Sequence, residues 1–162
     1  MNNRVIELFG FILIFSAIGL FSAIITYSPN DPNFLYNIDN SNINNILGLK
    51  GSIVSDFFLQ SIGLISIILS INFFIWGFKL LRKKIINNFI SKIFYTVIYI
   101  LSGTTLIYIY NNTSYWLIDN GNSGFLGRII GENLQILTGL DQNLYFIIVL
   151  LVLTVVFFFI KC

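Results

Sequence analysis

The sequence predicts an all-α integral membrane domain of four transmembrane helices, with a short interfacial or re-entrant helix before the fourth. First, 56% of the 162 residues are hydrophobic and only 10% are charged, whereas soluble domains carry about 25% charged residues. Second, the apolar residues gather in long runs that polar loops separate. Third, these runs are apolar on all sides rather than alternating with polar residues, which favours helices over the strands of a β-barrel.

The four longest apolar runs predict the spans of a single membrane domain that covers residues 1–162. About 20 helical residues cross a hydrocarbon core of roughly 30 Å. The expected spans are residues 5–26, 57–78, 93–110 and 144–160. The first run exceeds the roughly 7–15 residues of a signal-peptide core, and no Ala-x-Ala cleavage site follows it, so we expect an uncleaved anchor.

Charge distribution predicts the orientation of these spans. The loop at residues 79–92 is basic and contains no acid, whereas most acidic residues lie in the loops at 27–51 and 111–143. Basic loops stay on the cytoplasmic side of the membrane, so we expect both chain termini to be cytoplasmic. The residues that determine this topology are Lys79, Arg82, Lys83, Lys84 and Lys92. Such residues serve orientation and contact with the lipid bilayer, and five of them do not make a nucleic-acid-binding module.

The two outer loops differ in character. The first opens with both prolines of the chain, in Tyr27-Ser28-Pro29-Asn30-Asp31-Pro32, where the first helix cannot continue. An Asn-rich stretch follows, and a short interfacial helix is expected near residues 43–51. In the second loop, the glycine-spaced segment 121–139 predicts a short helix at about 123–137, either re-entrant or interfacial. This segment lacks the Gly-Lys-Ser/Thr that a phosphate-binding loop requires.

Small and polar residues inside the spans indicate helix packing. Two stripes at helical spacing predict that the first and second spans pack together, with packing between copies of the chain as the alternative. Asn72 is the strongly polar residue well inside a span, and we expect it to bond to a neighbouring helix. The candidate packing residues are Gly19, Ala23, Gly63, Ser66, Ser70 and Asn72.

Residue usage argues against several kinds of chemistry. The chain has no His and a single Cys, at position 162. We therefore expect no disulfide within the chain, no metal site, no cofactor and no His-based acid–base catalysis. The spans hold no paired acids and no nucleophile beside a base, so we expect no intramembrane enzyme.

A series of motifs occurs in a fixed order along the chain. It comprises Tyr27 to Pro32, Asn45 to Gly48 with Gly51, then Asp56, Gln60 and Gly63, then Trp76-Gly77 with Leu80-Leu81, and finally Gly121 to Gly131. With the expected topology, this series resembles the N-terminal four-helix membrane domain of the FtsK/SpoIIIE family of DNA translocases. The resemblance spans nearly the whole chain.

The resemblance implies a membrane anchor or scaffold at the division septum of the bacterial inner membrane, with a role in cell division and chromosome segregation. It implies contacts with other division-site membrane proteins and self-association, and it suggests a partner-contact loop of Tyr27, Ser28, Asp31 and Pro32. The 162 residues contain no Walker A or B motif, so we expect no ATPase activity. An excerpt, an incomplete gene or a split anchor subunit would each explain the end at Cys162.

A small transporter or channel subunit of the inner membrane is the alternative function. The glycine-rich outer segment and its possible re-entrant helix favour it. The lack of ionisable residues near the bilayer centre counts against it, because such residues line ion and substrate pathways.

Overall fold

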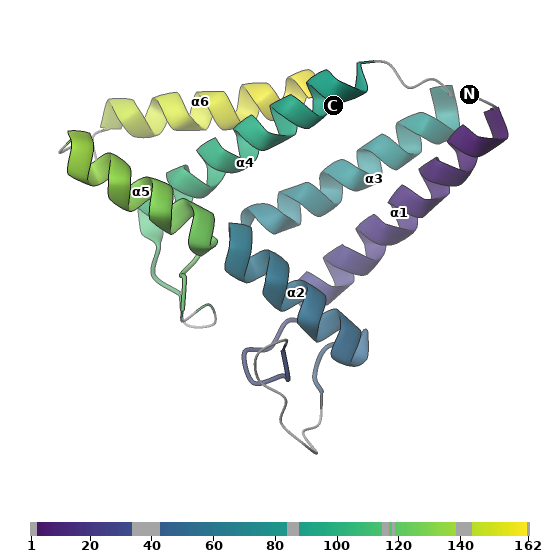
Figure 1. The fold of residues 1–162 in the computed structure, drawn as a ribbon, viewed down its shortest axis with the longest axis horizontal. Coiled ribbons are helices and arrows are strands. Elements are labelled where there is room, and N and C mark those ends of the chain that lie inside the picture. Colours follow the sequence, from purple (N-terminus) through teal and green to yellow (C-terminus); the bar gives the residue numbers. More distant parts are fainter. Residues whose placement is uncertain are drawn as a thin grey trace. The chain divides into compact units, whose positions relative to one another are not determined.

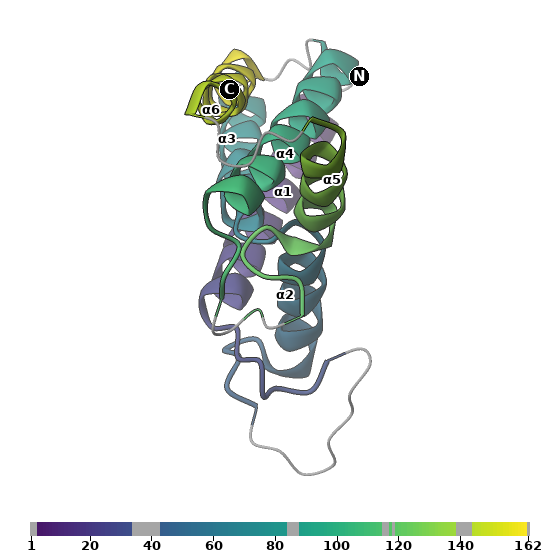
Figure 2. The same cartoon turned by 90° about the vertical axis from the view of Figure 1, so that its left-hand side faces the viewer.

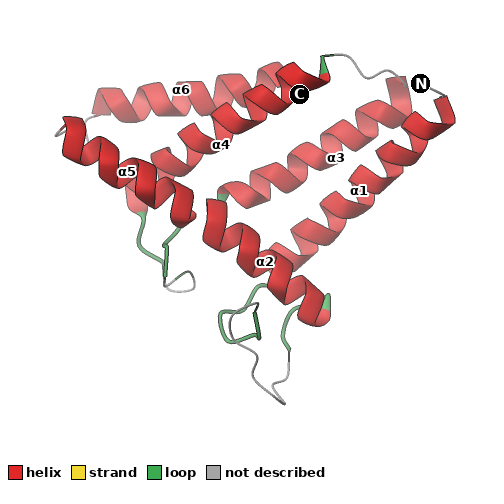
Figure 3. Ribbon diagram, viewed as in Figure 1, coloured by secondary structure: helices red, strands yellow, loops and turns green. Residues whose placement is uncertain are grey.

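Six helices make up the part of the chain that the computed structural model describes, and no strand occurs in that part (Figure 3). The described residues are 3–33, 43–83, 88–114, 117, 119–138 and 144–161. The helices are α1 (Asn3–Ile25), α2 (Gly48–Ile62), α3 (Ile65–Lys83), α4 (Phe89–Asn111), α5 (Gly124–Thr138) and α6 (Leu144–Lys161). The all-helical fold class is therefore confirmed.

Three of these helices are long and apolar enough to cross a membrane. They are α1, α3 and α4, with 23, 19 and 23 residues, and the apolar stretch Tyr145–Ile160 within α6 is shorter. α5 occupies the position where a short helix was expected before the last span. The chain divides into two compact units, of which unit 1 comprises Met1–Phe57, Ser66–Phe89 and Cys162, and unit 2 comprises Phe58–Ile65 and Ile90–Lys161.

The second span differs from the single helix expected at residues 57–78. α2 ends at Ile62 and α3 begins at Ile65, so the short helix expected at 43–51 is replaced by a longer one that begins at Gly48. The division has a local cause. Gly63 has a φ of 59°, the left-handed conformation that commonly ends a helix and that glycine adopts without steric cost.

In unit 1, α1 and α3 lie side by side and antiparallel (Figure 1). A Cβ atom on Gly77 would lie 2.7 Å from the Gly10 carbonyl oxygen and 2.7 Å from Cγ1 of Ile14. The two helices therefore approach so closely that only glycine fits at this crossing, as small residues allow in membrane proteins. The first and second spans pack together as expected, but Gly10 is a contact residue that the sequence analysis did not select.

The candidate packing residues differ in their surroundings. Ala23, Ser66, Ser70 and Asn72 are almost completely buried, and Gly63 lies against the backbone of residues 122–124. Gly19 is different, because a Cβ atom placed on it would meet no atom within 4 Å. Gly19 therefore makes no close helix contact in the described part of the chain.

In unit 2, α4 and α6 are joined by aromatic side chains. The rings of Tyr95 and Phe157 lie 5.6 Å apart, and those of Tyr99 and Phe158 meet edge to face at 5.9 Å. Aromatic pairs in these arrangements add to the packing energy of the buried surface. Most other described side chains of α6 are apolar and exposed, as expected of a helix that faces lipid.

The order of a long helix, a loop, a short helix and another long helix occurs twice along the chain. α2 and α5 both contain 15 residues, and each begins at a glycine with positive φ, 63° at Gly48 and 67° at Gly124. At about 1.5 Å per residue, both helices are too short to cross a bilayer. When Gly48 is aligned with Gly124, further matches without a gap are Gly51/Gly127, Ile53/Ile129, Asp56/Glu132, Gly63/Gly139 and Leu64/Leu140. These matches indicate an internal repeat.

The glycine crossing in unit 1 predicts opposite effects for two similar mutations. Gly77→Ala should lower the free energy of unfolding by about 1–3 kcal/mol, because the new methyl group collides with backbone. Gly19→Ala should raise it by about 0.5–1 kcal/mol through helix propensity, because its Cβ enters open space. Unfolding in mixed micelles of increasing denaturing detergent measures both. Equal effects of the two mutations would contradict the close α1–α3 crossing.

Candidate functional site

The described residues of the loop between α1 and α2, the first loop expected on the outer side, gather around the carboxylate of Asp31, which is only 4% exposed. Its Oδ1 accepts hydrogen bonds from the backbone N–H of Asn44 at 2.9 Å and from Nδ2 of the same residue at 3.0 Å. Its Oδ2 accepts a bond from the Asn45 N–H at 2.8 Å. Bonds to an ionised acceptor are stronger than those between neutral groups, so this carboxylate fastens the two ends of the loop together.

The prolines place Asp31 at the end of a tight turn. The Ser28 carbonyl oxygen accepts a hydrogen bond from the Asp31 N–H at 3.1 Å, so Pro29 and Asn30 are the central residues of a β-turn. Proline at the second turn position and serine at the first are favoured there. Pro29 and Asn30 are exposed, whereas Pro32 is buried.

Asn45 connects this loop to the end of α1. Its Nδ2 donates to the Ala23 carbonyl oxygen at 2.8 Å and lies 3.4 Å from Oγ of Ser55 on α2. The last carbonyl groups of a helix lack partners within the helix, and Asn45 satisfies one of them. Thr26 contributes nearby, because its Oγ1 accepts a bond from the Ile46 N–H at 3.2 Å.

Two further contacts hold the loop against α2. The Tyr27 hydroxyl donates to Oδ1 of Asp56 at 3.1 Å, and the Ser52 hydroxyl donates to the Pro32 carbonyl oxygen at 2.6 Å. The proposed partner-contact residues therefore have different surroundings. Tyr27 and Ser28 are half-buried, whereas Asp31 and Pro32 are buried and support the loop from within.

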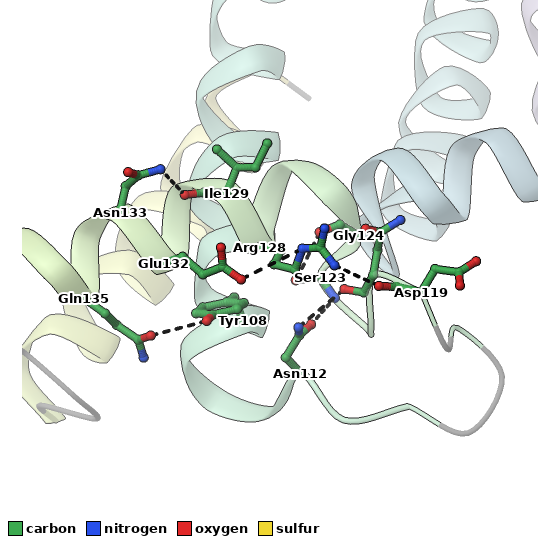
Figure 4. Close-up of polar contacts among 11 residues, drawn as sticks. Tyr108, Asn112, Asp119, Ser123, Gly124, Arg128, Ile129, Glu132, Asn133 and Gln135 are labelled. Carbon is green, nitrogen blue, oxygen red and sulfur yellow. Dashed lines mark hydrogen bonds and ion pairs between the residues drawn. The ribbon is translucent and has the colours of Figure 1, made fainter.

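The described residues of the loop between α4 and α5, the second loop expected on the outer side, gather around Asn112 (Figure 4). Oδ1 of Asn112 accepts a hydrogen bond from the Ser123 N–H at 3.0 Å, and its backbone carbonyl accepts one from the Asn122 N–H at 3.3 Å. Nδ2 of Asn120 donates to Oε1 of Gln60 at 2.9 Å. In this loop, side-chain amides make the stabilising hydrogen bonds that the Asp31 carboxylate makes in the first loop.

Backbone contact joins the α2–α3 break to the start of α5. The Leu64 N–H donates to the Asn122 carbonyl oxygen at 2.9 Å. A Cβ atom on Gly63 would collide with this same carbonyl oxygen, and one on Gly124 would collide with the backbone nitrogen of Gly63. Gly63 and Gly124, both with positive φ, therefore lie against one another. The Leu64 N–H, which has no partner within a helix at the break, is hydrogen-bonded by the Asn122 carbonyl oxygen.

α5 lies beside α4 in both views (Figure 2). A Cβ atom on Gly127 would lie 2.6 Å from the Thr104 carbonyl oxygen, and one on Gly131 would enter the Tyr108 ring. Glycines on one face of α5 thus set its close contact with α4. The Tyr108 hydroxyl donates to Oε1 of Gln135 at 3.3 Å, and Arg128 donates to the Asp119 carbonyl oxygen at 2.9 Å (Figure 4).

The amide of Asn72 differs from the expectation of a bond to a neighbouring helix. Asn72 is fully buried, and in the described part of the chain neither Nδ2 nor Oδ1 has a hydrogen-bond partner. The local sequence explains part of this result. The positions three and four residues away are Ile68, Leu69, Ile75 and Trp76, and none of these side chains offers an acceptor.

Three of the five basic residues expected to determine topology lie at the opposite end of unit 1 from Asp31. Lys79, Arg82 and Lys83 belong to the last turns of α3, and Leu81 approaches Gly10 near the start of α1. Lys92 lies in the first turns of α4, while Lys84 lies outside the described residues. Among those residues, no group of three His, Cys, Asp or Glu side chains is placed to hold a metal ion.

The fold and its loops define a multi-pass membrane domain. A family model described as the 4TM region of DNA translocase FtsK/SpoIIIE matches residues 2–161. The chain therefore belongs to this family of membrane domains.

Individual relatives agree with this assignment. The DNA translocase FtsK of Rickettsia bellii is 29% identical over 151 residues, which are 92% of this chain and 19% of that protein. The DNA translocase FtsK of Rickettsia typhi is 29% identical over 106 residues, 65% of this chain and 14% of the relative. The Rickettsia prowazekii protein of the same name is 27% identical over 131 residues, 81% and 16% of the two chains. The chain thus spans less than a fifth of the length of these relatives. No solved structure matches it.

Mutations of Gly48 and Gly63, two glycines with the same backbone conformation, should show how much the α2–α3 break depends on contact with residues 122–124. Gly48→Ala should lower the free energy of unfolding by about 1–2 kcal/mol, which is the strain of a left-handed alanine. No steric collision adds to this strain, because a Cβ atom on Gly48 enters open space. Gly63→Ala should lower the free energy of unfolding by at least about 1 kcal/mol more than Gly48→Ala does, because its Cβ also collides with the Asn122 carbonyl oxygen. Detergent-induced unfolding of the two variants gives the difference, and equal costs would mean that strain alone acts at Gly63.

Proposed function

We propose that this chain is the membrane anchor and scaffold domain of a septum-associated DNA translocase that acts in cell division and chromosome segregation. The observation that carries the proposal is the family match across residues 2–161, together with the helical membrane fold. The relatives that bear the name DNA translocase are more than five times longer than the matched region. The ATP-driven motor of such a protein would therefore lie outside the membrane domain.

An orientation with both termini in the cytoplasm supports this function, because a motor joined to the domain must reach chromosomal DNA. Lys79, Arg82 and Lys83 occupy one end of α3. The loop held by Asp31 and Asn45 lies at the other end of unit 1, where Asn45 bonds to Ala23 near the end of α1. The positive-inside rule assigns the basic end to the cytoplasm and the Asp31 loop to the outer face.

The outer loop of unit 1 is suited to contact other division-site membrane proteins. Pro29 and Asn30 are exposed at its turn, and Tyr27 and Ser28 are half-buried beside them. Asp31 fixes the loop from below through its three hydrogen bonds. A turn whose backbone is already held by hydrogen bonds loses little conformational entropy when a partner binds. In this proposal Asp31 and Pro32 act by holding the shape that the exposed residues present.

The orientation predicts the accessibility of Cys162, the only cysteine of the chain. In intact spheroplasts, a membrane-impermeant maleimide should leave Cys162 unlabelled, and it should label the residue after the membrane is permeabilised. An Asn30→Cys, Cys162→Ser variant should label in intact spheroplasts, since Asn30 is exposed on the outer loop. Labelling of Cys162 without permeabilisation would overturn the orientation.

The anchor proposal predicts recruitment that depends on the outer loop. A fluorescent fusion of the chain should gather at mid-cell in dividing cells. Asp31→Ala and Pro32→Ala should insert normally and reduce this enrichment severalfold, because the loop loses its fixed shape. Asn30→Ala tests direct contact, since its side chain is exposed and makes no hydrogen bond to the described residues of the loop.

Thr113→Ala, an exposed change in the second outer loop, is the matched control and should keep wild-type enrichment. All fusions are compared at equal protein level by immunoblotting of membrane fractions. An even distribution of the wild-type fusion around the envelope would contradict the septal anchor. Normal enrichment of the Asp31 and Pro32 variants would remove the outer loop from the recruitment surface.

A further inference from the structure

An open groove of about 280 Å³ lies along the basic end of α3 in unit 1. Its apolar part is formed by Phe74, Ile75 and Phe78, and its polar part by Lys79, Arg82 and Lys83. Phe74 and Phe78 are 44% and 55% exposed, so the apolar part is not filled by the protein. The two parts follow one another along the helix, with the apolar residues nearer the middle of the span.

Helical spacing explains why these residues share one surface. Residues three and four positions apart lie on the same side of a helix, which aligns Ile75 with Lys79, Phe78 with Arg82, and Lys79 with Lys83. At about 1.5 Å per residue, Phe74 lies roughly 12 Å deeper in the membrane than Arg82. The groove therefore runs from the depth of lipid acyl chains to the depth of headgroups.

The three cations are available for a ligand. Arg82 and Lys83 are exposed and Lys79 is half-buried, and no ion pair joins any of them to an acid within the described residues. Arginine binds phosphate oxygens through two parallel hydrogen bonds, and lysine adds a mobile point charge. A phosphate group at the mouth of the groove would thus meet one planar donor and two ammonium groups.

We propose that this groove binds an anionic phospholipid of the adjacent leaflet, which is the cytoplasmic leaflet in the orientation proposed above. The phosphate binds at Arg82 with Lys79 and Lys83 around it, and an acyl chain lies along Phe78 and Phe74. Basic pockets beside transmembrane helices on the cytoplasmic side are suited to anionic headgroups. At about 280 Å³ the groove lies slightly below the roughly 300–1,000 Å³ of common ligand pockets, so it would enclose only part of the phospholipid.

A simpler role for the cations is to cap the C-terminal end of α3 and to set topology. Lys92 separates the two explanations. It is a cation of the same loop region, in the first turns of α4, but it does not line the groove. A general attraction to an anionic surface uses Lys92 as well as Arg82, whereas a lipid in the groove uses Arg82 and leaves Lys92 out.

The chain contains two tryptophans, and Trp76 follows Ile75 of the groove directly, so lipid binding can be measured by fluorescence quenching. A Trp116→Phe background leaves Trp76 as the only reporter. The protein is reconstituted in phosphatidylcholine bilayers that contain a small fraction of either brominated phosphatidylglycerol or brominated phosphatidylcholine. The relative association constant of the anionic over the zwitterionic lipid should be well above one. Arg82→Gln should lower it about fivefold, the factor expected for one cation near an anionic headgroup.

The triple variant Lys79→Gln, Arg82→Gln, Lys83→Gln should bring this relative constant to about one, whereas Lys92→Gln should leave it within about twofold of the wild-type value. An unchanged constant in the triple variant, or an equal decrease in Lys92→Gln, would overturn the site. Competition by soluble glycerol phosphate at millimolar concentration would overturn it too, because the ligand would then be a free phosphate. If the triple variant fails to reconstitute, Arg82→Gln compared with Arg82→Lys and Lys92→Gln decides the question, since only Arg82→Gln removes a groove charge.

Discussion

The satisfaction of backbone hydrogen bonds where helices end is the constraint on which this fold depends. In hydrocarbon an unpaired N–H or C=O group costs several kcal/mol, so non-helical backbone is tolerated near the membrane only where protein groups bind it. The chain leaves regular helix at several points within the described residues. At these points the described structure supplies a partner, such as Nδ2 of Asn45 for the Ala23 carbonyl and the Asn122 carbonyl for the Leu64 N–H. The short helices α2 and α5 start beside these contacts.

The two halves of the internal repeat meet this constraint with different chemistry. The first has a loop of more than twenty residues and closes it with a buried carboxylate, that of Asp31. The second has a shorter loop, closes it with the amide of Asn112, and presses α5 against α4 through Gly127 and Gly131. The glycines that begin α2 and α5 are common to both halves. The conserved element of the repeat is thus the left-handed start of a short helix, and the loop before it is free to differ.

Features that depend on composition can be predicted from the sequence, whereas features that depend on a single contact between residues cannot. The all-helical fold class follows from long apolar runs, because the bilayer leaves the backbone few choices. The helix near residues 123–137 follows from its glycine-spaced segment, which is too apolar for an ordinary loop. The break at Gly63 was not predicted, since one glycine within an apolar run is equally compatible with a continuous helix. Gly10 was overlooked because its contact with Gly77 depends on how two helices cross. Within the described residues the expected hydrogen bond of Asn72 to a neighbouring helix does not occur, and the sequence alone does not show which helix Asn72 faces.

For the candidate site, the prolines and Asp31 could be selected from the sequence, but their roles could not. Proline and aspartate in an outer loop suggest an exposed recognition motif. The structure instead buries Asp31 beneath the turn, and among residues 27–32 the exposed ones are Pro29 and Asn30. The distinction depends on Asn44 and Asn45, which lie more than ten residues away and look like ordinary loop residues. The residues that form a tight turn are adjacent in sequence, so a turn can be predicted from them. The hydrogen-bond partners of a buried carboxylate depend on how the rest of the loop folds, so they cannot be predicted in this way.

This use of polar side chains suits a scaffold. Asp31, Asn45, Ser52 and Asn112 all bind backbone groups of their own chain, so their hydrogen bonds fix the described parts of the two loops. A partner that binds such a surface does not have to order it first, and ordering costs about 0.5–1.5 kcal/mol for each side chain immobilised. Within a membrane, where apolar contact with lipid and with protein are nearly equivalent, a fixed polar outline is the feature by which one membrane protein can distinguish another. In the proposed scaffold, the bonds that fix the chain between its helices would therefore also define the surface that a partner recognises.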